Sequence, residues 1–484
     1  MHAAVPIPQR MALLLRVWRE SRRRICVRGR RFQEAAALFV KTCRRAYRPP
    51  PHRVGWQGSA TERYAMGVHY AEYREIDIAD YDAVVVGCGF AGAVAARELA
   101  ERGCMRVLVI EKRSQIAGNM YDERDDAGIL VHRFGPHIFH TNEMRVFNYV
   151  RRFSGWIGYQ HKVLADWHGT CIPVPFNKNS MEIVFGEERA SELIDKLIAA
   201  FGDECKVTIN ELRSQDDPDL AEVADFVYEN VFLYYTQKQW GLTPDEVDPS
   251  VTARVPVFIS RDNRYFQDEF QGMPALGYTK LFEEMLDLDA IDVCLNTDAE
   301  SVFDLVFEDE SEDAGLSAIK LRGRVFEGPI IYTGPLDELF LARFGRLPYR
   351  SLDFVYETHD EEYLLPCATV NFTVSEDYTR ITEFKHMTRQ RSQKTTIMKE
   401  YPRPYEDPSR QTPYYAIIND ENRRHYERYR KLTSTLPNFY PLGRLAEYRY
   451  YNMDKIISLA LDLSDRIISE HRKAEAATSA AHEE

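Results

Sequence analysis

The chain has 484 residues, of which 44% are hydrophobic and 28% are charged, enough for a large core and for more than one domain. Its net charge is −13, which argues against a nucleic-acid partner and means that any anionic ligand must be held by a few placed arginines. The eight cysteines form no CxxC pair or His/Cys cluster, and no apolar run reaches the ~20 residues of a spanning helix. We therefore expect a cytoplasmic protein with free thiols, no metal site and no transmembrane segment.

The N-terminal part differs from the rest, and we expect residues 1–79 to form a basic, disordered extension. Its first 65 residues carry 15 Lys and Arg against three acidic residues. Arg22–Arg24 and Pro49–Pro51 interrupt any long regular element. Three interpretations stay open: a disordered tail, an Arg-rich organellar targeting segment, or sequence upstream of a true start at Met66. None of them gives this part a role in the chemistry.

The first strong motif begins at Asp82. Asp82–Val86 is a short, mostly β-branched run that predicts a buried strand, and it leads directly into Gly87-Cys88-Gly89-Phe90-Ala91-Gly92. A helix is expected over 93–102 and a second strand over 106–110, followed by Glu111. This order of strand, glycine-rich turn, helix, strand and acid is typical of a dinucleotide-binding unit.

Each part of the unit has a physical role. Gly87 permits the tight turn, Gly89 lets the backbone approach a pyrophosphate, and Gly92 lets helix and strand pack closely. The helix N-terminus offers free N–H groups and a positive dipole end to the phosphates. A carboxylate at Glu111 can accept hydrogen bonds from ribose hydroxyls, which favours FAD or NAD over NADP.

The residues after Glu111 narrow the choice of dinucleotide. They resemble the segment that continues along the pyrophosphate in FAD-dependent enzymes of the amine-oxidase and hydroxylase type. NAD dehydrogenases do not usually have it, so we expect FAD. The cofactor-binding residues predicted in this part of the chain are Gly87, Gly89, Phe90, Gly92, Glu111, Lys112, Gly118 and Asn119.

Five later segments resemble those of the bacterial UDP-galactopyranose mutases, flavoenzymes that make UDP-galactofuranose. The resemblance runs from about Asp82 to about Ile468, and the order and spacing of the segments match the family. A generic flavoprotein would share only the first ~40 residues of this part. The segments are Phe134–Asn142, Tyr235–Gly241, Asn263–Phe266 with Gln271-Gly272, Tyr378–Arg380, and Gly443–Tyr448.

The resemblance implies a site for a nucleoside diphosphate sugar. It places the diphosphate between Arg254, in a lid over 253–261, and Arg380, because planar guanidinium groups pair two phosphate oxygens at once. It assigns stacking of the uracil to Tyr265 and places His137 in a loop beside the isoalloxazine ring. The implied catalytic residues are Arg254, Arg380 and His137, the other substrate-binding positions are Tyr235, Trp240, Arg350, Tyr415, Tyr450 and His161, and the remaining cofactor positions are Arg444, Asn452 and Met453.

The family's reaction, carried over as an expectation, has no net redox change. Reduced FAD attacks the anomeric carbon through N5 and displaces UDP, and the sugar opens and recloses through its 4-hydroxyl. An external reductant, such as NAD(P)H or a reductase, first makes the hydroquinone. A helix predicted over Ile456–Ile468 would point its N-terminus near flavin O2 and stabilise the reduced state. The product would serve the synthesis of cell-wall or surface polysaccharide.

The predicted fold class is α/β, or α+β overall, with three structural regions. They are a Rossmann-like FAD-binding domain, a helical substrate or lid domain and an antiparallel β-sheet domain. The resemblance also implies a homodimer or larger homo-oligomer. The expected boundaries are 80–160, 287–345 and 425–470 for the FAD-binding domain, 177–286 for the helical domain, 161–176 and 346–424 for the sheet domain, and 471–484 for a C-terminal tail.

Other functions stay open beside UDP-galactopyranose mutation. His161 and Asn452 stand where the family commonly has an asparagine and an aspartate, which favours a mutase of another nucleotide-linked sugar. A conventional FAD-dependent oxidoreductase of the amine-oxidase type and a non-catalytic FAD-binding protein are further alternatives. The presence of Arg254, Arg380 and Tyr265 argues against both.

Overall fold

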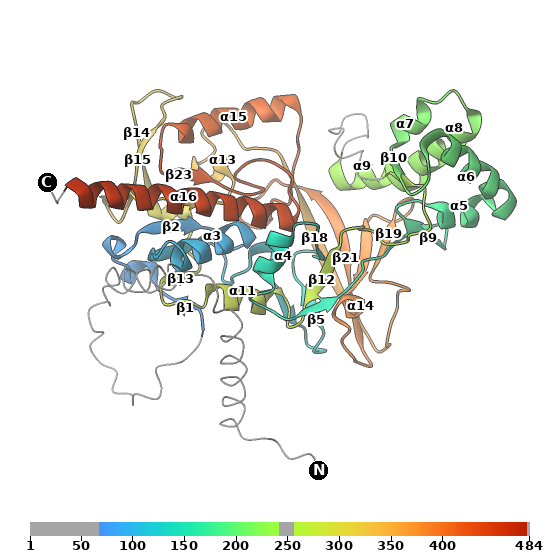
Figure 1. Ribbon diagram of the computed structural model, residues 1–484, viewed down its shortest axis with the longest axis horizontal. Coiled ribbons are helices and arrows are strands. Elements are labelled where there is room, and N and C mark those ends of the chain that lie inside the picture. The colour runs from blue at the N-terminus through green and yellow to red at the C-terminus, as the bar shows by residue number, and fades with distance from the viewer. Residues whose placement is uncertain (1–66, 242–255, 482–484) are drawn as a thin grey trace, which may run out of the picture. The chain divides into compact units, whose positions relative to one another are not determined.

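A six-stranded parallel sheet carries the dinucleotide-binding part of the protein (Figure 1). The computed structural model describes residues 67–241 and 256–481, so most of the N-terminal extension and Arg254 lie outside the described residues. Every neighbouring pair in this sheet is parallel, although its strands come from distant parts of the chain. In spatial order they are β1 (His69–Tyr70), β13 (Ile291–Cys294), β3 (Val107–Ile110), β2 (Ala83–Val86), β17 (Ile330–Tyr332) and β23 (Phe439–Pro441).

The central strands β2, β3 and β17 are buried at every residue, which is why they read as continuous apolar runs. Val85 and Val107 contact a layer formed by α3 (Phe90–Glu101), α11 (Tyr278–Leu286) and α16 (Met453–Ala481). Val84 and Val86 point the opposite way and contact a second layer. That layer contains β14 (Phe303–Phe307), β15 (Leu316–Leu321) and α15 (Asp420–Ser434). The predicted strand, helix and strand around the glycine-rich turn are therefore confirmed.

Three segments lie differently from the expected boundaries. Residues 69–70, assigned to the extension, form β1 because they pair with β13 at the edge of the parallel sheet. Residues 278–286, assigned to the helical domain, form α11, whose Phe282 contacts the ring of Phe90 at 4.7 Å between centroids. Helix α16 continues past residue 470 into the expected tail, and its side chains from 472 to 478 are exposed.

A separate seven-stranded sheet is the other large sheet of the described structure. It is antiparallel as expected except for one pair, β8 with β19, which is parallel; these two strands are far apart in the chain, as the long connection of a parallel pair requires. All of its strands fall within the two ranges expected for the sheet domain. In spatial order they are β22 (Tyr415–Ala416), β18 (Tyr349–His359), β21 (Thr395–Pro404), β20 (Arg380–Glu383), β19 (Thr369–Phe372), β8 (Val163–Trp167) and β9 (Thr170–Val174).

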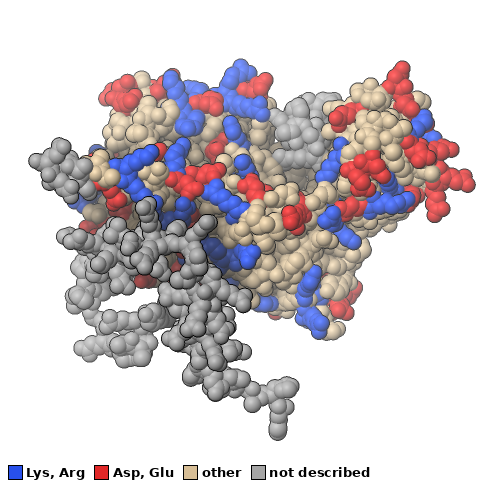
Figure 2. Space-filling model, viewed as in Figure 1, with Lys and Arg blue, Asp and Glu red and all other residues tan. Residues whose placement is uncertain are grey.

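A group of helices packs on the β8–β9 end of this sheet. In α6, Ala190, Leu193, Ile194 and Leu197 are buried at helical spacing and join β8 and β9 in one apolar core. On the face shown in Figure 2, acidic side chains gather over α6 and α8. The helices are α5 (Lys178–Phe185), α6 (Glu187–Phe201), α7 (Ile209–Arg213), α8 (Pro218–Val227), a π-helical turn (Tyr228–Leu233) and α9 (Tyr234–Trp240).

Shorter elements connect these layers. None of the helices within 67–241 and 256–481 combines the length and apolar character that a membrane crossing needs. The cysteines in those ranges form no disulfides. The other strands and α-helices are β4 (Asp122–Arg124), β5 (Leu130–His132), β6 (Phe139–Thr141), α4 (Met144–Val150), β7 (Trp156–Gly158), β10 (Lys206–Val207), β11 (Val257–Phe258), β12 (Phe270–Pro274), α12 (Ala299–Val302), β16 (Arg324–Val325), α13 (Leu336–Leu339) and α14 (Lys385–Thr388), and short 3-10 helices lie at Tyr73–Glu75, Ile78–Asp80 and Gly118–Met120.

Candidate functional site

One cavity of 990 Å³ runs from the glycine-rich turn to the seven-stranded sheet. This volume is at the upper end of the roughly 300–1,000 Å³ of small-molecule sites, which suits an extended cofactor together with a second ligand. No three metal-ligating side chains gather anywhere in the described part of the chain. The predicted site residues that line the cavity are Gly87, Gly89, Phe90, Glu111, Lys112, Gly118, Asn119, His137, His161, Tyr235, Tyr265, Arg380, Tyr415, Arg444, Tyr450, Asn452 and Met453.

The turn between β2 and α3 forms a backbone cradle at one end of the cavity. Gly87 has φ +94°, and a Cβ there would lie 2.0 Å from the hydroxyl oxygen of Thr333. Gly92 does not line the cavity but supports the turn, since its Cβ would lie 1.9 Å from the carbonyl oxygen of Gly87. Gly89 faces the Cα of Gly118 with no side chain between them. The turn therefore leaves the N-terminus of α3 open to a phosphate group.

Glu111 follows β3 at the edge of the same cradle and is 5% exposed. Its carboxylate accepts hydrogen bonds from the backbone N–H groups of Cys88 (2.8 Å) and Arg113 (2.9 Å). Burial raises the pKa of this carboxyl, and these two N–H groups oppose that change. Each carboxylate oxygen keeps a lone pair for a further donor, so the group can still receive ribose hydroxyls.

Two elements from the C-terminal part complete this end. Gly443 lies against the first turn of α3, where its Cβ would be 3.2 Å from that of Ala91. The guanidinium of Arg444 lies 4.4 Å from the ring centre of Tyr450. The first turn of α16 opens onto the cavity at Asn452 and Met453. The cavity thus receives the positive dipole ends of two helices, α3 and α16, which fit a pyrophosphate and an anionic ring system.

The loop at Gly135–His137 also faces the cavity, and a residue missed by the sequence analysis holds it. His132 accepts a hydrogen bond at Nδ1 from the backbone N–H of His137 (3.1 Å) and is 1% exposed. Burial lowers the pKa of His137 to about 3, so its imidazole is neutral at physiological pH. A neutral, buried imidazole suits positioning better than proton transfer near neutral pH.

Arg380 supplies the positive charge at the other end. Its Nε lies 3.0 Å from Glu400, which sits directly opposite on β21 and is 1% exposed. Burial alone would lower the pKa of Arg380, but Glu400 and nearby tyrosines raise it well above the usual value. Within the described residues, the two terminal nitrogens of Arg380 have no hydrogen-bond partner. The guanidinium fork is therefore charged and available to an anion.

Aromatic side chains surround this charge. Tyr235, on α9, and Tyr415, on β22, are both close enough to Arg380 to change its pKa. His161 lies beside them, and its backbone carbonyl accepts a hydrogen bond from Tyr265 N–H (2.8 Å). Burial first and Arg380 second lower the pKa of His161 to about 3. Its Nδ1 is bound to the Tyr159 hydroxyl at 3.1 Å, which leaves Nε2 for a ligand.

Two predicted substrate contacts, Arg350 and Trp240, are absent from the cavity lining and contact residues near it. The guanidinium of Arg350 donates to the carbonyls of Gln239 (3.0 Å) and Lys238 (3.1 Å) at the end of α9. Trp240 contacts the ring of Tyr415 at 5.5 Å between centroids. Neither residue is part of the cavity lining, so direct contact with substrate stays a prediction for both, as it does for Arg254.

Two family profiles match this chain, one over the dinucleotide-binding part and one over most of the rest of the site. The NAD(P)-binding Rossmann-like domain profile matches residues 85–153, and the UDP-galactopyranose mutase profile matches residues 230–450. A probable UDP-galactopyranose mutase of Klebsiella pneumoniae is 34% identical over 389 residues, which cover 80% of this chain and 94% of that protein. The chain belongs to the UDP-galactopyranose mutase family.

Two further comparisons describe the family's range. A dTDP-fucopyranose mutase of Escherichia coli is 32% identical and is covered over 99% of its length and 81% of this chain. A crystal structure of reduced UDP-galactopyranose mutase shares the fold, with a TM-score of 0.58 at 16% identity, covering 80% of this chain and 94% of that one. Membership of this family, together with the Rossmann-like cradle, indicates a flavin cofactor, and the backbone cradle, Glu111 and the two helix ends fit a flavin dinucleotide.

The cradle makes a testable prediction at Gly92. A methyl group at this position would press on the Gly87 carbonyl, so Gly92→Ala should displace the turn and weaken flavin retention by about tenfold or more. Flavin retention is measured as the ratio of flavin absorbance to protein absorbance after gel filtration. Gly158→Ala, where the added Cβ meets open space, is the control. Full flavin content in Gly92→Ala would contradict the assigned role of the turn.

A second prediction concerns pH. The His161 pKa is about 3 in the folded protein and about 6.5 in the unfolded chain, so the unfolded chain binds more protons between these values. Stability should fall as the pH drops from about 6.5 toward 3, by about 1.4 kcal/mol at pH 5.5. Melting temperatures of the wild type and His161→Asn at pH 7.5 and 5.5 measure this effect. The melting temperature of the variant should fall less than that of the wild type on acidification. An equal fall in both proteins would contradict the prediction.

Proposed function

We propose that this enzyme binds FAD, uses it in the reduced state, and interconverts UDP-galactopyranose and UDP-galactofuranose. The observation that carries the proposal is that one cavity joins the dinucleotide cradle to the charged fork of Arg380. The cradle suits the cofactor, and the fork suits the diphosphate of a nucleotide sugar. Reduced FAD, when bound, would supply the nucleophile that displaces the nucleoside diphosphate from the anomeric carbon.

The chain's own residues would position the reactants and stabilise charge. Arg380 would pair the diphosphate as it leaves and keep it in place for its return. Tyr235, Tyr415 and Tyr450 would donate hydrogen bonds to phosphate and sugar oxygens without bringing negative charge. Tyr265 would stack on the uracil. The N-terminus of α16 would stabilise negative charge on the reduced ring.

The activity test uses the purified, FAD-loaded protein. It is reduced with dithionite, mixed with UDP-galactofuranose, and the products are separated by chromatography. The proposal expects UDP-galactopyranose with the reduced protein and far less with the oxidised protein. A reduced, FAD-loaded protein that forms none of this product would overturn it. A conventional oxidoreductase would instead show flavin reduction driven by its substrate, which the mutase reaction does not produce.

A second candidate substrate is a deoxythymidine-linked sugar. A relative named dTDP-fucopyranose mutase is covered almost completely, and His161 presents a neutral ring nitrogen to the cavity. The same assay with dTDP-fucopyranose discriminates the two substrates by their relative kcat/KM. The external reductant, an assembly of two or more copies and a cytoplasmic location stay predictions.

Arg380→Ala tests the proposed clamp. Losing a fixed charge that stabilises the leaving diphosphate should lower kcat/KM by about 10²-fold or more. The FAD content should stay at the wild-type level, because Arg380 lies on the sheet and not in the cradle. Arg403→Ala is a matched control, since Arg403 also pairs with a carboxylate across β18 and β21 but lies outside the cavity lining. Loss of flavin from Arg380→Ala would show that this arginine has another role.

A further inference from the structure

Helix α9 is fastened to the seven-stranded sheet by the ammonium group of Lys238. Its Nζ donates to three backbone carbonyls, those of Phe372 (2.5 Å), Glu376 (2.9 Å) and Tyr378 (3.2 Å). An ammonium group has three protons, so this cage of carbonyls satisfies all of them. Phe372 is the last residue of β19, and the other two acceptors lie in the connection between β19 and β20.

Both ends of this link carry residues of the proposed substrate site. On α9, Tyr235 lies three positions before Lys238, one helical turn away. On the sheet, Arg380 begins β20 two positions after Tyr378. Tyr235 and Arg380 both line the cavity, and each changes the other's pKa. The Lys238 ammonium therefore joins the element that bears Tyr235 to the element that bears Arg380.

Arg350 makes a second link to the same helix from another strand. It lies on β18, is 8% exposed, and donates to the last carbonyls of α9. A cation at this end also complements the helix dipole. Arg350 holds the end of α9 against the β18 side of the sheet, whereas Lys238 holds the helix against the β19–β20 connection.

We infer that Lys238 is a positioning residue that sets the separation of Tyr235 and Arg380, and hence the fit of the nucleoside diphosphate. This inference rests on the proposed function. Misplacing a binding group by about 1 Å costs on the order of 10²-fold in rate. Replacing Lys238 by an apolar side chain leaves three carbonyls without donors, so the β19–β20 connection and α9 have no polar link there.

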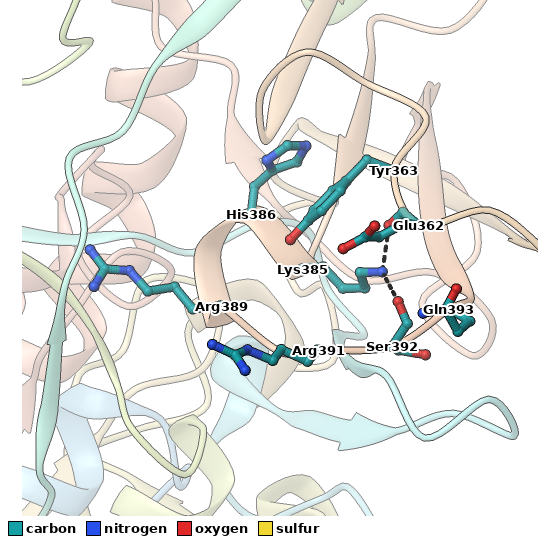
Figure 3. Close-up of a pocket in the computed structure, with 8 residues that line it drawn as sticks. All are labelled: Glu362, Tyr363, Lys385, His386, Arg389, Arg391, Ser392 and Gln393. Carbon is teal, nitrogen blue, oxygen red and sulfur yellow. Dashed lines mark hydrogen bonds between the residues drawn. The ribbon is translucent and has the colours of Figure 1, made fainter.

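The chain contains a matched control, Lys385. It is fully buried, and its Nζ donates to the carbonyls of Glu362, Ser392 and Lys394, so it also has three backbone acceptors. Figure 3 shows the bonds to Glu362 and Ser392. This second cage lines a separate pocket with Tyr363 and His386, and none of its residues lines the substrate cavity. The two lysines therefore have the same kind of hydrogen-bond partners, but Lys238 links elements that line the substrate cavity and Lys385 does not.

The test compares Lys238→Met with Lys385→Met in the FAD-loaded protein. Calorimetry gives the Kd of UDP, steady-state assays give kcat and KM, absorbance gives flavin content, and thermal denaturation gives the melting temperature. Both variants should have a lower melting temperature than the wild type and the same FAD content. Lys238→Met alone should weaken UDP binding by about tenfold and lower kcat/KM by about 10–100-fold, at temperatures well below melting.

Two outcomes would overturn the inference: unchanged UDP affinity and kcat/KM in a folded Lys238→Met, or equal losses in Lys385→Met. If Lys238→Met does not fold, Lys238→Arg is measured instead. It keeps the charge but spreads its donors in a plane, so it should weaken UDP binding by a smaller factor, and wild-type affinity would refute the inference. Failure of the proposed function is distinguishable, because the wild type would then lack mutase activity while the UDP measurement still compares the variants.

Discussion

A positive charge inside a largely buried cavity needs a fixed counter-charge, and the ion pair of Arg380 with Glu400 meets this need. Glu400 takes the Nε side of the guanidinium and leaves the opposite fork toward the cavity. Without this partner, burial would favour loss of the charge or of the buried conformation. The pair also sits on adjacent strands of the sheet, so the register of β20 and β21 fixes where the fork points.

The two ends of the cavity use different parts of the polypeptide. The dinucleotide end is made mostly of backbone, with glycine turns, the ends of α3 and α16, and one acid. Such a site depends on close approach, which explains why the space around Gly87 and Gly92 has no room for a side chain. The other end is made of side chains, with one guanidinium and a group of phenols and imidazoles. Its precision depends on how separate elements are held together, which is where Lys238 and Arg350 act.

Much of the fold was predictable from local pattern. The order of β2, the glycine-rich turn, α3, β3 and Glu111 follows from short-range spacing, because each residue there acts on neighbours within about 30 positions. The domain assignments of α11 and β1 were harder to predict from the sequence. Their residues join the parallel sheet or its helical cover only through contacts with segments distant in the chain, and local pattern does not carry that information.

The sequence by itself determined the dinucleotide-binding unit, because its glycine and acid positions follow directly from motif spacing. The resemblance to the mutase family singled out some of the other residues that line the cavity, Arg380 among them. The tertiary structure alone decided which residues support them. Glu400 acts through the strand register that places it opposite Arg380, and Lys238 acts through carbonyls at least 134 positions away in the chain. His132 is only five positions from His137, but no motif in the sequence marks it as the residue that holds the loop. Such roles depend on where strands and helices meet in space, and that depends on packing of the whole chain.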